Sequence, residues 1–191
     1  MLRIPMKALL LSTLFVVPIT ASAQSTNPAT DMSPNTETKS TKDNLSGSDE
    51  SFFTKAAEAG LAEIEGAKLA QQKASTSEVK DFAARMITDH TKVSEELKAL
   101  AIKKGVTLPT EPSLIQKGEI KALSLLDDKF DENYVDRMAV SAHESTITLF
   151  KDTVKDSKDA DIKAFAQKTL PALESHLDMA KKLHPTVSKT K

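Results

Sequence analysis

The chain has 191 residues, with 26 basic and 27 acidic side chains, so its formal net charge is −1. This near balance gives no electrostatic reason to bind nucleic acid or an anionic membrane. The absence of cysteine excludes disulfides, thiolate metal ligands, catalytic thiols and a lipid-anchored cysteine.

The first 23 residues carry the three regions of a secretory signal. Arg3 and Lys7 accompany an apolar run over residues 8–17, and Ala-Ser-Ala at 21–23 is a typical cleavage site. The run is too short for a membrane-spanning helix, which needs roughly 20 apolar residues. We therefore expect cleavage before Gln24 and an exported, periplasmic or secreted protein with a mature net charge of about −3. We expect no transmembrane segment after the signal is removed.

The composition changes again near residue 48. Residues 24–48 are almost all Ser, Thr, Asn, Pro or charged, and only Met32 and Leu45 are large and apolar. Such a stretch buries too little surface to offset the entropy of ordering, so we predict a disordered tether. Residues 49–184 are long enough for one domain with one core, and residues 185–191 are predicted to be a flexible tail.

Helical periodicity runs through the whole predicted domain, and no alternating pattern indicates a strand. The spacing predicts four long helices over residues 49–73, 75–104, 128–156 and 159–183, and a short helix over 114–126. Two helical hairpins joined by a long crossover are the connectivity of ferritin-like four-helix bundles. We therefore predict an all-α, ferritin-like four-helix bundle whose crossover contains the short helix.

Local signals mark several helix boundaries. Ser75 and Glu78 have the spacing of a capping box at the start of the second helix, and Gly105 is expected to end it. Pro171 is expected to kink the last helix. His184, near the end of that helix, is expected to act as a cap that complements the helix dipole.

Three of the four histidines lie on the apolar stripes of different helices, at similar heights. With about 1.5 Å of rise per residue, Glu63 and His90 lie nearly level relative to the first hairpin turn. His143 and His176 are level within roughly one turn relative to the second hairpin turn. Neutral imidazoles and a carboxylate that converge in a bundle suit zinc, iron, manganese or copper. These four residues are therefore the candidate metal ligands.

An alternative for the same residues is a hydrogen-bonded polar layer that fixes the register of the helices. The Glu-x-x-His motifs of di-iron bundles are missing, which favours one mononuclear ion over a di-iron centre if a metal binds. Asp89 points about 100° away from its neighbour His90 around the helix, so we expect it to be solvated or paired with a neighbouring helix.

Several stretches together resemble the domain-of-unknown-function 4142 family of exported, ferritin-like bacterial proteins. They are AEIEGAKLA, VKDFAARMITDHTKVSEEL, FDENYVDRM, AHESTITLF and LPALESHLDMA, which lie in this order within residues 49–183. The resemblance implies a four-helix bundle but no established activity. It maps the family pattern onto Glu63, Asp89, His90, His143, Pro171 and His176.

Two functions remain open at this point. The first is a non-enzymatic structural, interaction or stress-protection module with an unidentified protein partner. The alternative is a periplasmic metal-binding bundle used for storage, buffering or redox, in which one transition-metal ion is the candidate cofactor. The sequence has no glycine-rich phosphate loop, no Gly-x-Ser-x-Gly and no His-Glu-x-x-His motif, so it does not favour an enzyme.

Overall fold

The computed structural model describes residues 45–187, and these residues form helices with no strand among them. The elements are α1 (Gly47–Lys73), α2 (Ser77–Lys104), α3 (Leu114–Ser124), α4 (Phe130–Tyr134), the π-helical segment η1 (Val135–Ser141), α5 (Ala142–Asp156) and α6 (Ala160–Val187). The predicted all-α class is confirmed. The predicted signal and residues 24–44 of the predicted tether lie outside the described residues.

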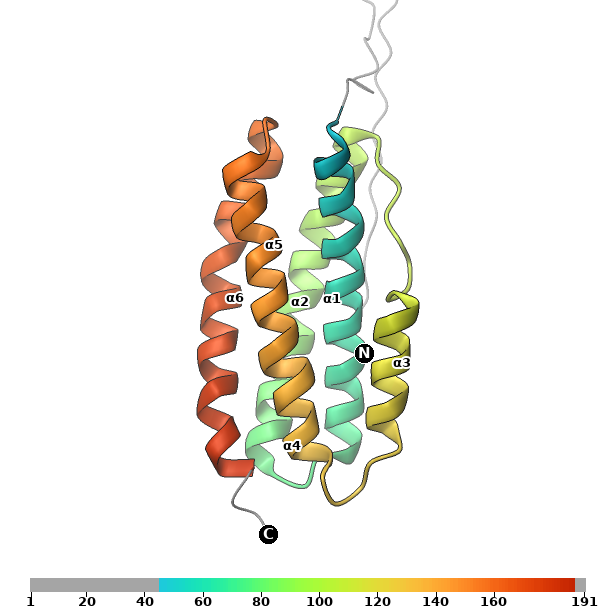
Figure 1. Cartoon of the computed structure of the whole chain (residues 1–191), viewed down its shortest axis with the longest axis vertical. Coiled ribbons are helices and arrows are strands. Elements are labelled where there is room, and N and C mark those ends of the chain that lie inside the picture. The colour runs from blue at the N-terminus through green and yellow to red at the C-terminus, as the bar shows by residue number, and fades with distance from the viewer. Residues whose placement is uncertain (1–44, 188–191) are drawn as a thin grey trace, which may run out of the picture. The chain divides into compact units, whose positions relative to one another are not determined.

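Four long helices form two antiparallel hairpins that pack against each other. Figure 1 shows α1 beside α2 and α5 beside α6, and α1 also contacts α5 while α2 contacts α6. The connection after α2 returns along the bundle to α3, which lies beside α1 (Figure 1). The second hairpin can therefore begin at the same end of the bundle as the turn between α1 and α2. This arrangement is compatible with the predicted ferritin-like topology.

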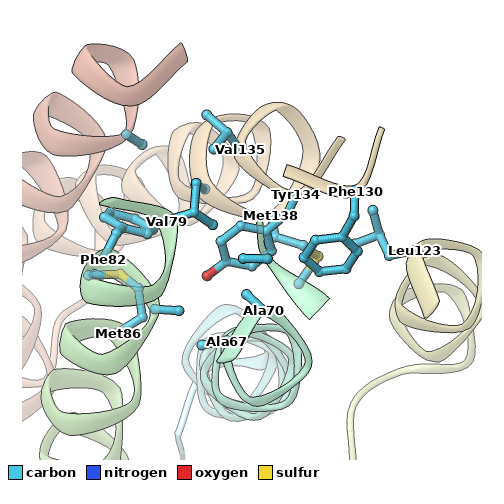
Figure 2. Packing of buried hydrophobic residues seen from close by; sticks show 14 of the residues in the cluster. Ala67, Ala70, Val79, Phe82, Met86, Leu123, Phe130, Tyr134, Val135 and Met138 are labelled. Atoms are coloured by element: carbon cyan, nitrogen blue, oxygen red, sulfur yellow. The ribbon is translucent and has the colours of Figure 1, made fainter. Parts of the chain in front are cut away.

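The core consists of two apolar clusters. The tyrosine cluster surrounds Phe130, Tyr134 and Met138 and reaches Leu123 of α3, as Figure 2 shows. The phenylalanine cluster contains Phe52, Phe53, Phe150 and Phe165, and the ring centroids of Phe52 and Phe150 lie 5.1 Å apart. Full burial of each such side chain contributes about 1.5–3 kcal/mol. On α2, on α6 and on the continuous stretch from α4 through η1 to α5, the buried histidine falls between the residues of the two clusters.

The first helix begins two residues earlier than predicted. The Ser46 hydroxyl accepts a hydrogen bond from the backbone N–H of Asp49 at 3.1 Å, so the cap precedes Gly47. The predicted tether boundary at residue 48 therefore falls inside α1. At the other end of the chain, α6 continues through Pro171 and Pro185 to Val187, so residues 185–187 are helical and not part of a tail.

The predicted capping box of the second helix is wrong, because its cap comes from a distant residue. The N-cap is Thr76, whose side chain makes no capping bond within α2. The Asp131 carboxylate of α4 instead accepts bonds from the backbone N–H and the hydroxyl of both Ser75 and Thr76, at 2.8–3.2 Å. Gly105 does end α2, with a left-handed φ of 68°.

One side-chain contact holds the end of α6 against the rest of the bundle. His184 lies in the last turn of α6, and its Nε2 is 2.7 Å from Oδ1 of Asp136 in η1. This contact joins the last turn of α6 to η1, which precedes α5 in the second hairpin.

Within residues 45–187, no helix is long and apolar enough to cross a membrane.

Candidate metal centre

Three histidine rings from three helices meet in the middle of the bundle. The ring centroids of His90 from α2, His143 from α5 and His176 from α6 lie 5.3–5.5 Å apart. Each ring offers one nitrogen, and these three nitrogens all lie within 4.8 Å of one another. The exposed fractions are only 5%, 1% and 2%, in the same order. The fold therefore brings together the three histidines whose spacing along the sequence predicted similar heights.

The remaining long helix, α1, contributes a carboxylate next to these rings. Glu63 of α1 is 3% exposed, and its Oε1 lies 3.4 Å from Nδ1 of His143. Glu63 thus contacts His143, one of the three clustered histidines, and we call these four residues the histidine layer. Two antiparallel hairpins place them there because Glu63, His90 and His176 lie within the long helices, and His143 lies near the middle of the continuous helical stretch of α4, η1 and α5.

Asp89 was expected to be either solvated or paired with a neighbouring helix, and it pairs with α6. Its Oδ2 lies 2.9 Å from Nε2 of His176 and 3.2 Å from Nε of Arg85. A carboxylate can only accept, so Nε2 of His176 carries the proton and donates it to Asp89. The other nitrogen, Nδ1, then has a free lone pair and faces the buried side. Metal-binding histidines are commonly oriented by such a carboxylate.

The layer contains an unusual set of unpaired polar atoms. Among the described residues, these buried atoms have no hydrogen-bond partner: Oε1 of Glu63, Nε2 of His90, Nδ1 and Nε2 of His143, and Nδ1 of His176. Leaving one buried polar group unpaired costs about 1–3 kcal/mol. Native structures contain few such groups, and here they concentrate at one point. Oε1 of Glu63 and Nδ1 of His143 approach each other to 3.4 Å without forming a hydrogen bond, so the contacts within the protein leave the layer poorly satisfied.

Burial keeps the rings of His90 and His143 neutral. Burial, followed by the charges of His143 and His176, lowers the pKa of His90 from 6.5 to about 3. Burial and the charge of His176 lower the pKa of His143 to about 4, although the carbonyls of Met138 and Ala139 oppose this. Neutral imidazoles have the free lone pair that metal binding requires.

The other two members of the layer are also shifted towards their neutral forms. Burial lowers the pKa of His176, and the hydrogen bond and charge of Asp89 oppose this lowering. Burial raises the pKa of Glu63 well above its ordinary value of 4.5. Burial therefore disfavours the charged form of every member of the layer. A cation bound beside Glu63 would favour the ionised form of its carboxyl group.

A π-helical segment precedes His143 and was not predicted. The sequence indicated one helix over residues 128–156, but the chain forms α4, η1 and α5, and the Ala142 N–H donates to the Arg137 carbonyl five residues back. This register brings the carbonyls of Met138 and Ala139 near the His143 ring. π segments of this kind are frequent at functional sites.

The sequence does contain a signal for this segment. Val135, Ala139, His143 and Ile147 follow each other at intervals of four and are all buried. In a regular α-helix each interval of four turns about 40° too far, so the stripe would drift by about 120° over three intervals. The wider turn of a π segment compensates for this drift. The interpretation of this stripe as an ordinary α-helix was therefore too simple.

Tyr134 is a buried polar residue near the layer that the sequence analysis also missed. It belongs to the tyrosine cluster (Figure 2), and its hydroxyl has no hydrogen-bond partner among residues 45–187. Burial, and then the charge of Glu63, raise the pKa of Tyr134 well above its ordinary value. Its aromatic ring alone made it look like an ordinary core residue.

The fold and this layer define a class of protein: an all-α bundle with three buried histidines and one buried glutamate at its centre. Residues 34–183 match the family described as Domain of unknown function (DUF4142). The chain belongs to this family, as its sequence motifs indicated. No curated protein and no solved structure matches the chain.

Proposed function

We propose that the protein is a periplasmic metal-binding bundle, and that Glu63, His90, His143 and His176 hold one mononuclear transition-metal ion. The observation that supports this is the group of buried, unpaired nitrogen and oxygen atoms in the histidine layer. A layer that served only helix register would pair these atoms with one another. The unpaired atoms therefore favour the metal-binding alternative over the structural or interaction module.

The donor set suits several ions. Three imidazole nitrogens and one carboxylate oxygen, without thiolate, are ligands for zinc, iron, manganese or copper. Nitrogens bound to one tetrahedral zinc ion lie roughly 3.4 Å apart. The nitrogens of the three histidines lie within 4.8 Å of one another, so each pair must approach by up to about 1.4 Å to reach that separation.

Each residue has a distinct task in this proposal. His90 and His143 offer neutral rings, and His176 offers Nδ1 because Asp89 holds the proton on Nε2. Glu63 binds as its carboxylate and supplies the one negative charge in the layer. Such an ion supplies Lewis acidity and, for iron, manganese or copper, also one-electron chemistry. Storage, buffering or redox are the roles that this set can serve.

The test is metal content and metal titration of untagged full-length protein. We expect one ion per chain after purification without chelator, and saturable calorimetric binding of zinc, manganese, iron(II) or copper. A variant with His90, His143 and His176 all changed to Ala should lose binding, whereas His184→Ala, a histidine outside the layer, should retain it. Absence of saturable binding tighter than about millimolar for every ion would refute the proposal.

A further inference from the structure

A small cavity adjoins the histidine layer on the side of the phenylalanine cluster. Its volume is about 20 Å³, and Glu63, His90, Gly60, Thr146, Phe150 and Leu173 are among the residues that line it. We call it the inner cavity. A cavity needs roughly 10–15 Å³ to hold one water-sized molecule. The inner cavity therefore has room for one such molecule in contact with two members of the layer.

A second space lies next to the inner cavity and opens to solvent. An outer pocket of about 490 Å³ lies between α1, α3, η1 and α5, and Lys55, Gln116, Arg137 and Asp152 are among its lining residues. Ala59, Glu63 and Thr146 line both the outer pocket and the inner cavity. These three side chains are the wall between the two spaces. Glu63 thus touches both the solvent-facing pocket and the buried layer.

We propose that the inner cavity binds one small uncharged molecule, of the size of water or a diatomic gas, as an additional ligand of the ion. This inference rests on the proposed metal site. The molecule enters from the outer pocket, past Glu63 and Thr146. Most of the cavity wall is apolar, with Ala56, Val93 and Phe150 among the lining residues, and such a wall disfavours a charged ligand.

A metal ion in the histidine layer could bind a small molecule in the inner cavity as an additional ligand. Structural metal sites are closed by protein ligands, whereas reactive sites keep a position for an exogenous ligand and can expand to five-coordination. The layer offers four protein donors, and the cavity lies against two of them, Glu63 and His90. Four protein donors alone would close a tetrahedral site, so a small molecule in the inner cavity would be a fifth ligand that reaches the ion beside Glu63 and His90.

Two glycines provide a matched pair of variants. A Cβ added at Gly60, which lines the cavity, would meet only the Ser94 hydroxyl oxygen within 4 Å, at 3.1 Å. A Cβ added at Gly118 on the exposed face of α3 would meet nothing within 4 Å. Both positions lie inside helices, where Ala is preferred to Gly. Gly60→Ala should therefore fold well while it fills the cavity, and Gly118→Ala is the control.

The experiment uses full-length protein loaded with iron(II) without oxygen and titrated with nitric oxide, followed by electron paramagnetic resonance and visible absorption. We expect a saturable iron–nitrosyl signal in the wild type and in Gly118→Ala. In Gly60→Ala we expect the same iron affinity but at least tenfold weaker nitric oxide binding. A second variant, Ala59→Leu in the wall, should slow nitric oxide binding.

The possible failures separate the two proposals. If iron binds but nitric oxide gives no nitrosyl signal in the wild type, the cavity proposal is wrong and the metal site stands. Equal nitric oxide affinity in Gly60→Ala and the wild type also overturns the cavity proposal. If neither iron nor any other ion binds the wild type, both proposals fail together.

Discussion

Nε2 of His176 lies 2.9 Å from Oδ2 of Asp89, and this contact joins α6 to α2 at the level of the histidine layer. Arg85, one turn before Asp89 on α2, holds the same carboxylate oxygen at 3.2 Å. The pair decides which nitrogen of His176 faces the layer. Asp89 is thus a positioning residue for a ligand rather than a ligand itself.

Removal of this partner should weaken metal binding without abolishing it. Asp89→Ala leaves Nε2 of His176 without its acceptor, so the ring loses its fixed tautomer and orientation. Outer-shell partners of this kind are typically worth 10- to 100-fold in metal affinity. We expect a loss in that range by calorimetric titration, and no change for Asp81→Ala, which removes an exposed acid from the same helix. An unchanged affinity in Asp89→Ala would show that the contact does not orient the ligand.

The metal-free protein should lose stability as the pH falls from 6.5 towards 4. The pKa values of His90 and His143 fall to about 3 and about 4 in the folded protein, from 6.5. In this interval the unfolded chain binds protons that the folded chain does not, which lowers the free energy of unfolding as the pH decreases. Each ring contributes up to about 1.4 kcal/mol per pH unit.

The measurement is urea unfolding with a chelator present, at pH 7.5, 6.0 and 5.0. His90→Gln should show a shallower pH dependence than the wild type, whereas His184→Gln should resemble the wild type. A wild-type stability that does not change between pH 7.5 and 5.0 would contradict the lowered pKa values of His90 and His143. It would mean that the two rings bind protons equally well in the folded and the unfolded chain.

Glu63→Gln should stabilise the metal-free protein at neutral and alkaline pH. Burial raises the pKa of Glu63 above 4.5, so its contribution to stability is present at low pH and is lost as the pH rises through the folded value. Glutamine has a similar shape and carries no charge. We expect a higher melting temperature for Glu63→Gln at pH 8.5 in chelator, together with weaker metal binding. Glu65→Gln, at an exposed position on the same helix, is the control. A lower melting temperature than the wild type would show that the carboxylate stabilises the layer.

Asp131→Ala should destabilise the protein by about 1–3 kcal/mol, because it removes the cap of α2 and strands the hydrogen-bond donors of Ser75 and Thr76. Burial works against ionisation of Asp131, but these hydrogen bonds outweigh it and lower its pKa. The stabilisation is therefore present above pH 3.8 and is lost as the pH falls further. Urea unfolding at pH 7.5 measures the effect, and Asp128→Ala, at a neighbouring exposed acid, should be nearly neutral. Equal stability of the two variants would show that the distant cap contributes nothing.

Export should remove residues 1–23, because their charged, apolar and small-residue regions stand in the order of a secretory signal. Mass spectrometry of protein from the periplasmic fraction should give a mature chain that begins at Gln24. A chain that still begins at Met1 in that fraction would contradict the prediction.

The sequence by itself determined the all-α class, the end of α2 at Gly105 and the residues of the histidine layer. Each of these follows from local rules: helical period, the left-handed tolerance of glycine, and the constant rise of a helix measured from a hairpin turn. Glu63 and His90 could be placed level with each other because one short turn joins their helices. His143 and His176 were placed by the same argument in the second hairpin.

Tertiary structure alone decided the cap of α2 by Asp131, the contact between Asp89 and His176, and the unpaired atoms of the layer. These depend on how one hairpin sits against the other, and residues more than fifty positions apart must meet for each of them. No local spacing encodes such a meeting, since it results from the packing of whole helix faces. The π segment before His143 depends on both the sequence and the tertiary structure. The spacing of four residues is visible in the sequence, but the packing of His143 into the core selects the π register.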